Sequence, residues 1–268
     1  MRLQAQVKNG KTILKDSYST QPFKLANITE DKKDHWLQLM LMSSSPGILD
    51  NDHYKMNIDL GEDCKVQLTT QSYQRIFQMK TGAKQEVEVR MRRGSSFIFL
   101  PHPAAPHKSS IFFSKTRFYL SEECLLIYGE VLACGRKLSG EVFKLSRYHS
   151  VTQVFSSGKL IVKENLLAAP DRINVTKIGQ LEGYTHQASF ICVANLTSVN
   201  TLLEGIHELL QKEADISFGA STLDDNGFCV RILGYKAEQL FKIHDLIARR
   251  IMSVHTKNVP VKTRAYAK

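Results

Sequence analysis

The sequence predicts a mainly β protein, with a body of many short strands that form a sandwich, a barrel or a β-helix and a small C-terminal α-β-β-α unit carrying two helices. Across residues 1–198, short runs alternate apolar and polar residues, as strands with one buried face do, and turn residues separate the runs. Two later stretches repeat apolar residues at helical spacing. Periodicity does not separate a sandwich, a barrel and a β-helix, and no strict internal repeat supports a regular solenoid.

The first element is a hairpin, because residues 3–7 alternate before Asn9-Gly10, a pair typical of hairpin turns, and residues 12–14 return. The segment 101–107 holds three prolines, which lack a donor and restrict their neighbours, so it is predicted to be neither helix nor strand. The other predicted strands cover 23–28, 36–42, 54–60, 64–71, 86–91, 97–100, 110–120, 124–134, a run that opens at 140–143, 151–155, 160–164 and 187–196.

The stretch 43–75 concentrates polar groups at strand ends. A Pro46-Gly47 turn is followed by Asp50 and Asp52. Of the two strands predicted after this loop, the second, 64–71, ends in Thr70 and Gln71. Uncharged polar side chains near carboxylates can line a polar passage or a site. The alternative is that they only satisfy backbone groups of the loops.

The last seventy residues change in character, which predicts a division into a β-rich body, 1–198, and an α-β-β-α unit, 199–268. Residues 201–204, Thr-Leu-Leu-Glu, resemble a capping box at the start of a helix. Strands at 216–221 and 228–233 flank the turn sequence 224–227. The two helices have apolar stripes formed by Leu202, Ile206, Leu209 and Leu210, and by Leu240, Ile243, Ile247 and Ile251.

Composition limits the function classes. The 268 residues carry a net charge of +10, which suits binding to nucleic acid, to an anionic membrane face or to an acidic protein partner. The basic residues are scattered along the chain, which favours the acidic protein partner. Five widely spaced cysteines form no Cys-x-x-Cys pair and are expected to be reduced. The chain starts without an apolar signal segment and has no apolar run of spanning length, so a soluble cytoplasmic protein is expected.

Motifs of common enzymes are missing from the sequence. It contains no phosphate-binding loop, no Gly-x-Ser-x-Gly elbow and no His-Glu-x-x-His helix, so no catalytic residues are predicted. For metal capture, His102 and His107 flank the proline-rich loop, and His186 follows a turn; surface histidines are the alternative. Glu130 lies among apolar residues and requires a partner, for which Arg136, a backbone donor or water is expected.

Taken together, these segments resemble the UreD family of urease accessory proteins, called UreH in some organisms. The order and spacing agree over nearly the whole chain. The matching pieces are Ser45-Pro46-Gly47, Asp50-Asn51-Asp52, Thr69-Thr70-Gln71-Ser72 with Arg75, Phe99-Leu100-Pro101, Glu130 with Gly135-Arg136, Gly140-Glu141-Val142-Phe143 and Gly183-Tyr184-Thr185-His186.

The resemblance implies a twisted β-helix-like or two-sheet body with two helices, and a non-enzymatic maturation factor for the nickel enzyme urease. It implies a UreF-type helical partner, a UreG-type GTPase and apo-urease as partners, with a homodimer of heterodimers as one arrangement, and transient nickel instead of a tightly bound cofactor. Nucleic acid and membrane are not expected partners. A basic β-rich nucleic-acid-binding protein is the alternative function.

The family implies that nickel travels through an internal polar passage. Oxygen ligands scattered over several strands admit and release a cation, whereas a four-ligand cage traps it. On this hypothesis Arg136 orients a carboxylate, and the residues that line or support the passage are Asp50, Asp52, Thr70, Gln71, Glu130 and Glu141.

Overall fold

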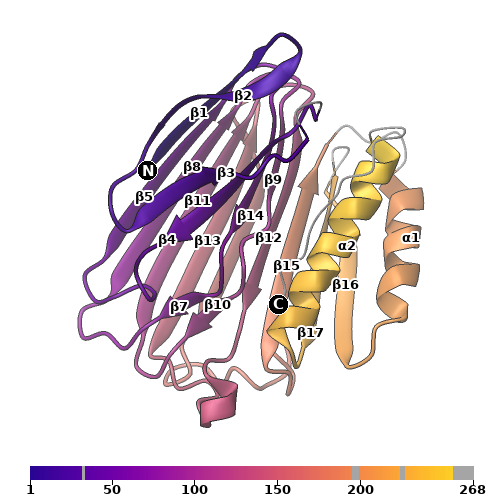
Figure 1. The fold of residues 1–268 in the computed structure, drawn as a ribbon. Coiled ribbons are helices and arrows are strands. Elements are labelled where there is room, and N and C mark those ends of the chain that lie inside the picture. The colour runs from indigo at the N-terminus through magenta and orange to yellow at the C-terminus, as the bar shows by residue number, and fades with distance from the viewer. Residues whose placement is uncertain (32–33, 195–198, 224–226, 256–268) are drawn as a thin grey trace.

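The computed structural model arranges the chain in three layers, which are two β-sheets and a pair of helices (Figure 1). It describes residues 1–31, 34–194, 199–223 and 227–255. The predicted mainly β architecture with two C-terminal helices is confirmed. No helix within these ranges combines the length and the apolar character needed to cross a membrane.

The first sheet has seven strands, and its central neighbours are parallel while its two outer pairs are antiparallel. The Asn9-Gly10 hairpin is confirmed as one of these outer pairs, and both turn residues have positive φ. In spatial order the strands are β14 (Lys159–Ala168), β13 (Arg147–Ser156), β11 (Ile111–Leu120), β8 (Ala83–Met91), β5 (His53–Leu60), β1 (Arg2–Lys8) and β2 (Lys11–Tyr18).

The second sheet has ten strands, and the strands of the C-terminal unit form one end of it. Two short strands, β7 (Gln74–Ile76) and β10 (Ala104–Pro106), pair beside the main series. In spatial order that series is β16 (Ile216–Thr222), β17 (Gly227–Gly234), β15 (His186–Val193), β12 (Leu125–Leu132), β9 (Ser96–Phe99), β6 (Lys65–Thr70), β4 (Leu37–Ser43) and β3 (Phe23–Asn27).

The chain winds between the two sheets. From β5 to β12 the longer strands alternate, β5, β8 and β11 in the first sheet and β6, β9 and β12 in the second. Parallel neighbours need a long crossover, and here a strand of the opposite sheet provides it in place of the usual helix. The body is therefore a two-sheet, β-helix-like coil, in agreement with the prediction.

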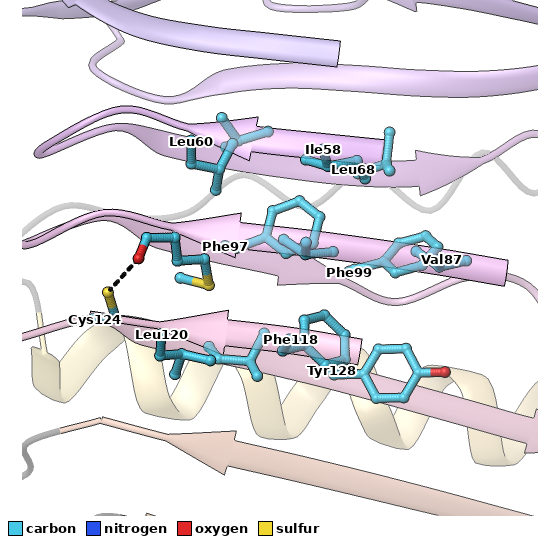
Figure 2. Packing of buried hydrophobic residues seen from close by; sticks show 14 of the residues in the cluster. Ile58, Leu60, Leu68, Val87, Phe97, Phe99, Phe118, Leu120, Cys124 and Tyr128 are labelled. Atoms are coloured by element: carbon cyan, nitrogen blue, oxygen red, sulfur yellow. Dashed lines mark hydrogen bonds between the residues drawn. The ribbon is translucent and has the colours of Figure 1, made fainter. Parts of the chain in front are cut away.

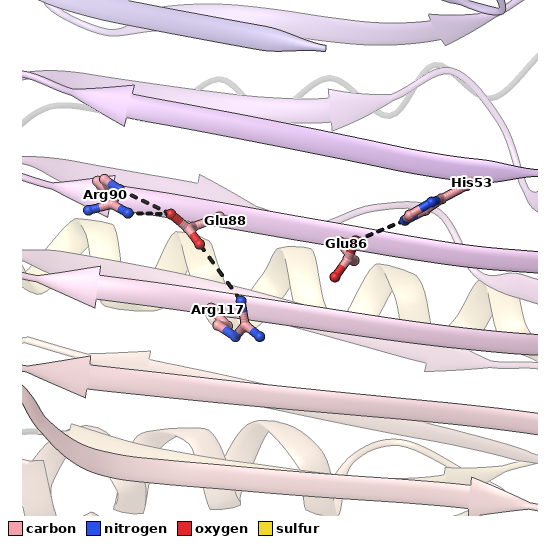
Figure 3. Close-up of polar contacts among 5 residues, drawn as sticks. All are labelled: His53, Glu86, Glu88, Arg90 and Arg117. Atoms are coloured by element: carbon pink, nitrogen blue, oxygen red, sulfur yellow. Dashed lines mark hydrogen bonds and ion pairs between the residues drawn. The ribbon is translucent and has the colours of Figure 1, made fainter.

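The main core lies between the sheets, where the inward faces of both meet (Figure 2). Met56, Ile58 and Leu60 of β5 are buried while Lys55 and Asn57 are exposed, as the alternation predicts. The outer face of the first sheet is polar. Figure 3 shows two of its charge pairings, in which His53 contacts Glu86 and Glu88 contacts both Arg90 and Arg117.

The helices α1 (Val199–Gln211) and α2 (Ala237–His255) cover the other face of the second sheet and form a second core with it. The stripe of α2 is fully buried, and Leu202, Ile206 and Leu210 are the buried residues of α1. The capping-box prediction is wrong, because α1 begins at Val199 and places Thr201 in its first turn. Val199 packs against this second core, so burial extends the helix past the local signal. Residues 224–226 of the predicted hairpin turn lie outside the described ranges.

Two local predictions are also corrected. The proline-rich segment contains β10, and its pairing with β7 needs no N–H from a proline. The Pro103 carbonyl accepts from the Gln74 N–H, and the His107 N–H donates to the Ile76 carbonyl. Residues 140–143 form no strand, since Gly140 and Phe143 both have positive φ after the short 3₁₀ helix η1 (Lys137–Ser139). A left-handed backbone breaks the extended conformation that strand pairing requires.

Candidate functional site

A cavity of about 140 Å³ lies between the two sheets. Its lining comes from β5, β8, β11 and β13 of the first sheet and from β3, β4, β6, β9, β10 and β12 of the second, together with the 43–48 and 71–74 segments. The volume is sufficient for several water molecules. Buried Tyr128 and Tyr148 lie on this lining together with exposed Ser43, Pro46 and Gln71, so the cavity connects the interior with the surface.

Glu130 brings a carboxylate into this cavity from β12. Its partners come from the opposite sheet: the Tyr148 hydroxyl donates over 2.6 Å and the Ser150 hydroxyl over 2.9 Å. Burial raises the pKa of Glu130, and the two hydroxyl donors oppose that rise. Arg136, one of the expected partners, pairs with Glu141 instead, and the packing of the sheets brings two hydroxyls of β13 to the Glu130 carboxylate.

Thr70 and His102 form a second polar pair on the lining, and Gln71 lies next to them. The backbone N–H of His102 donates to Thr70 Oγ1 over 2.8 Å, and the same hydroxyl lies 2.9 Å from Nδ1 of the ring. The His102 ring stacks on Phe241 of α2 with 4.6 Å between the ring centroids. Burial lowers the pKa of His102, which keeps the imidazole neutral and able to act as a ligand near pH 7.

The two aspartates of the opening loop have different positions. Asp52 accepts hydrogen bonds from the Leu49 N–H, over 2.8 Å, and from the hydroxyl of Tyr54, over 2.7 Å, and Tyr54 lines the cavity, so Asp52 supports the lining from behind. Asp50 lies outside the cavity. Its carboxylate accepts the backbone N–H groups of residues 80–82, and these hydrogen bonds, the one from Gly82 foremost, lower its pKa.

Arg136 and Glu141 also lie outside the cavity. They form an ion pair, with Arg136 Nε 2.9 Å from Glu141 Oε2, and the hydrogen bond from Arg136 lowers the pKa of Glu141 to about 2. Arg136 thus holds the carboxylate of Glu141, and its orienting role on the nickel route stays a prediction. Arg136 lines a larger cleft of about 1270 Å³ together with His107 and His186, both of which are buried and have lowered pKa values, about 4 for His186.

Of the predicted residues, the structure therefore gathers Thr70, Gln71, Glu130 and His102 around one cavity, with Asp52 behind it. Within the described residues, no three His, Cys, Asp or Glu side chains form a group that could hold a metal ion. The arrangement consists of dispersed single side chains that carry oxygen or nitrogen atoms.

Comparison with known proteins decides the family. The model of the family described as UreD urease accessory protein matches residues 1–265. The chain belongs to the UreD family. It is 44% identical to a protein of Flavobacterium johnsoniae named urease accessory protein UreD. The alignment of 251 residues covers 93% of this chain and 91% of that protein. A protein of the same name from Acetivibrio thermocellus is 37% identical, over 91% of this chain and 94% of its own length. Another from Haemophilus influenzae is 33% identical, over 92% of this chain and 95% of its own length.

This UreD-family chain has polar interior residues that the sequence analysis missed. Beyond Glu130 lies a second carboxylate, Glu164 of β14, which accepts hydrogen bonds from Ser189 and from Arg231 Nε, the latter over 3.0 Å. Burial is the main cause of the raised pKa of Glu130, and the charge of Glu164 adds to it.

Hydroxyl groups surround the region between these carboxylates. Thr152 is 1% exposed, and its Oγ1 has no hydrogen-bond partner within the described residues. Sheet register places Thr152 between Thr116 and Glu164. The signal for this polar strip was present in the sequence, because inward positions of two strongly alternating strands carry serine or threonine where apolar residues are usual.

Proposed function

We propose that this UreD-family chain is a non-catalytic urease maturation factor that conducts nickel through the cavity between its sheets toward the active site of apo-urease. The observation that supports the route is the Glu130 carboxylate at the buried part of a polar-lined cavity that reaches the surface. Family membership supports the role in urease maturation.

The ligand chemistry suits a cation that is passed on. Carboxylate, hydroxyl and imidazole groups bind first-row divalent metals, and nickel accepts both oxygen and nitrogen ligands. Conduction requires binding strong enough for entry and weak enough for release. Gln71, the Thr70–His102 pair and Glu130 line one cavity as separate ligands, and Glu164 continues the oxygen-rich strip beyond Glu130.

The remaining tasks of maturation belong to the partners. We infer that a UreF-type protein binds this chain, that a UreG-type GTPase supplies the nucleotide hydrolysis, and that the assembly docks on apo-urease. A chain that holds a passage for a cation needs no nucleophile or general base of its own, which is consistent with relatives named as accessory proteins.

The experiment is activation of apo-urease at limiting nickel by complexes that contain Glu130→Ala or Asp52→Ala. Both variants should lower the activation rate severalfold while size-exclusion chromatography shows the complex still assembled. Glu62→Ala, which changes an exposed carboxylate away from the cavity, serves as the control. Undiminished activation by both variants at limiting nickel would refute the passage.

A further inference from the structure

A large open cleft lies at the lower end of the molecule in Figure 1, near β7, β10 and the start of α2. Its volume is about 1270 Å³, which is far larger than the cavity between the sheets. The walls come from the end of the β body, from η1, from the segment after α1 and from the first turns of α2. None of the passage residues Thr70, Gln71 and Glu130 lies on it.

Exposed apolar side chains gather on this cleft. Four of the eleven large hydrophobic residues that are exposed in the described chain line it, namely Tyr73, Leu138, Tyr235 and Leu246. Leu138 is completely exposed on η1, although a leucine contributes nothing favourable to folding when it faces water. Apolar side chains gathered on one concave surface are typical of protein interaction sites.

The lining of the cleft also carries an excess of positive charge. Five cationic side chains line it against three carboxylates, which are those of Glu213, Asp215 and Glu238. Glu238 pairs with Lys242, and Arg136 pairs with Glu141. Arg75, Lys137 and Lys236 form no ion pair among the described residues; Lys137 instead lies over the ring of Tyr235, 5.8 Å from its centroid. Exposed aromatic and arginine side chains are the residue types that most often dominate binding energy.

The C-terminal residues of the chain are not complementary to this cleft. The thirteen residues that follow α2, 256–268, contain four lysine or arginine residues and no acidic residue, so they repel a positive cleft. The occupant must instead combine apolar side chains with carboxylates.

We propose that this cleft is the docking site for an amphipathic, acidic segment of a partner protein. Its apolar side chains pack on Tyr73, Leu138, Tyr235 and Leu246, and its carboxylates face Arg75, Lys137 and Lys236. The inference deepens the proposed accessory role and rests on it, because the partner is a component of the maturation assembly.

The test measures binding of the purified full-length chain to apo-urease and to each accessory protein of the proposed assembly, one at a time, by calorimetry. Leu138→Asp and the pair Arg75→Glu with Lys236→Glu should each weaken one of these complexes at least about tenfold. The charge-reversed variant should also show a weaker salt dependence. Ile178→Asp and Lys24→Glu change matched exposed positions outside the cleft and should bind as the wild type does.

Three results would overturn the docking site. The first two are wild-type affinity of both cleft variants for every partner and equal weakening of binding by the control variants. The third is self-association of this chain that Leu138→Asp abolishes, because it would assign the cleft to a second copy. Failure of the passage is distinguishable, because Glu130→Ala tests activation with binding intact. Cleft variants that bind normally refute the docking site alone, and normal activation by Glu130→Ala refutes the passage alone.

Discussion

Replacing Gly129 by alanine should destabilise the protein, because the new Cβ would crowd His244 of α2 and Leu100. A Cβ at Gly129 would lie 2.5 Å from His244 Nδ1 and 2.8 Å from Leu100 Cδ2, where ordinary contacts begin at 3.4 Å. His244 is 1% exposed and lies on the buried face of α2, so the ring cannot turn out into solvent. The ring or the helix must therefore move by about 0.9 Å, the difference between 3.4 and 2.5 Å.

Such overpacking costs about 1–3 kcal/mol. In a chain of this size each kcal/mol lowers Tm by roughly 2–4 °C, so Gly129→Ala should unfold roughly 2–12 °C below the wild type. Gly219→Ala is the matched control, because Gly219 also lies in a strand and a Cβ there meets nothing within 4 Å. Its Tm should stay close to that of the wild type.

A double-mutant cycle tests the assigned contact. His244→Ala alone leaves a cavity, whereas in the double variant the new Cβ at position 129 occupies part of the vacated space. The double variant should therefore lose at least about 1 kcal/mol less than the two single losses combined. Strict additivity, or a Gly129→Ala variant that melts with the wild type, would refute the reasoning.

Three further predictions concern buried and loop groups. Burial lowers the pKa of His244 from 6.5 to about 3, so the stability that its neutral form supports should be lost as pH falls from about 6.5 toward 3. Urea titrations of His244→Phe should lose that part of the pH dependence. An unchanged dependence of the unfolding free energy on pH would contradict the prediction. Tyr148→Phe removes a donor to buried Glu130 and should lower the free energy of unfolding by about 1–3 kcal/mol, and a loss below about 0.5 kcal/mol would argue against the bond. Asp50→Ala removes the acceptor for residues 80–82 and should lower Tm while activation at saturating nickel is retained; an unchanged Tm would show that the capping is unimportant.

Much of the fold followed from periodicity in the sequence. Residues 54–60 alternate with period two, and Met56, Ile58 and Leu60 are buried as predicted, while Tyr54 is half-buried. The stripe of Leu240, Ile243, Ile247 and Ile251 repeats with helical period and is buried as predicted. Local chemistry also placed the Asn9-Gly10 hairpin, because its turn requires positive φ at both residues. These features depend only on residues close together in the chain.

Only the tertiary structure decided which strands are neighbours and what meets inside. Alternation reveals which side of a strand is buried but not its partner, and neighbours such as β5 and β8 are separated by a strand of the other sheet. Glu130 therefore meets Tyr148 and Ser150 across the sheet interface, while Asp50 and Glu141, equally polar in the sequence, bind loop groups outside the cavity. The physical reason is that burial is encoded locally, whereas the encounter of two polar side chains depends on how the coil stacks one sheet on the other.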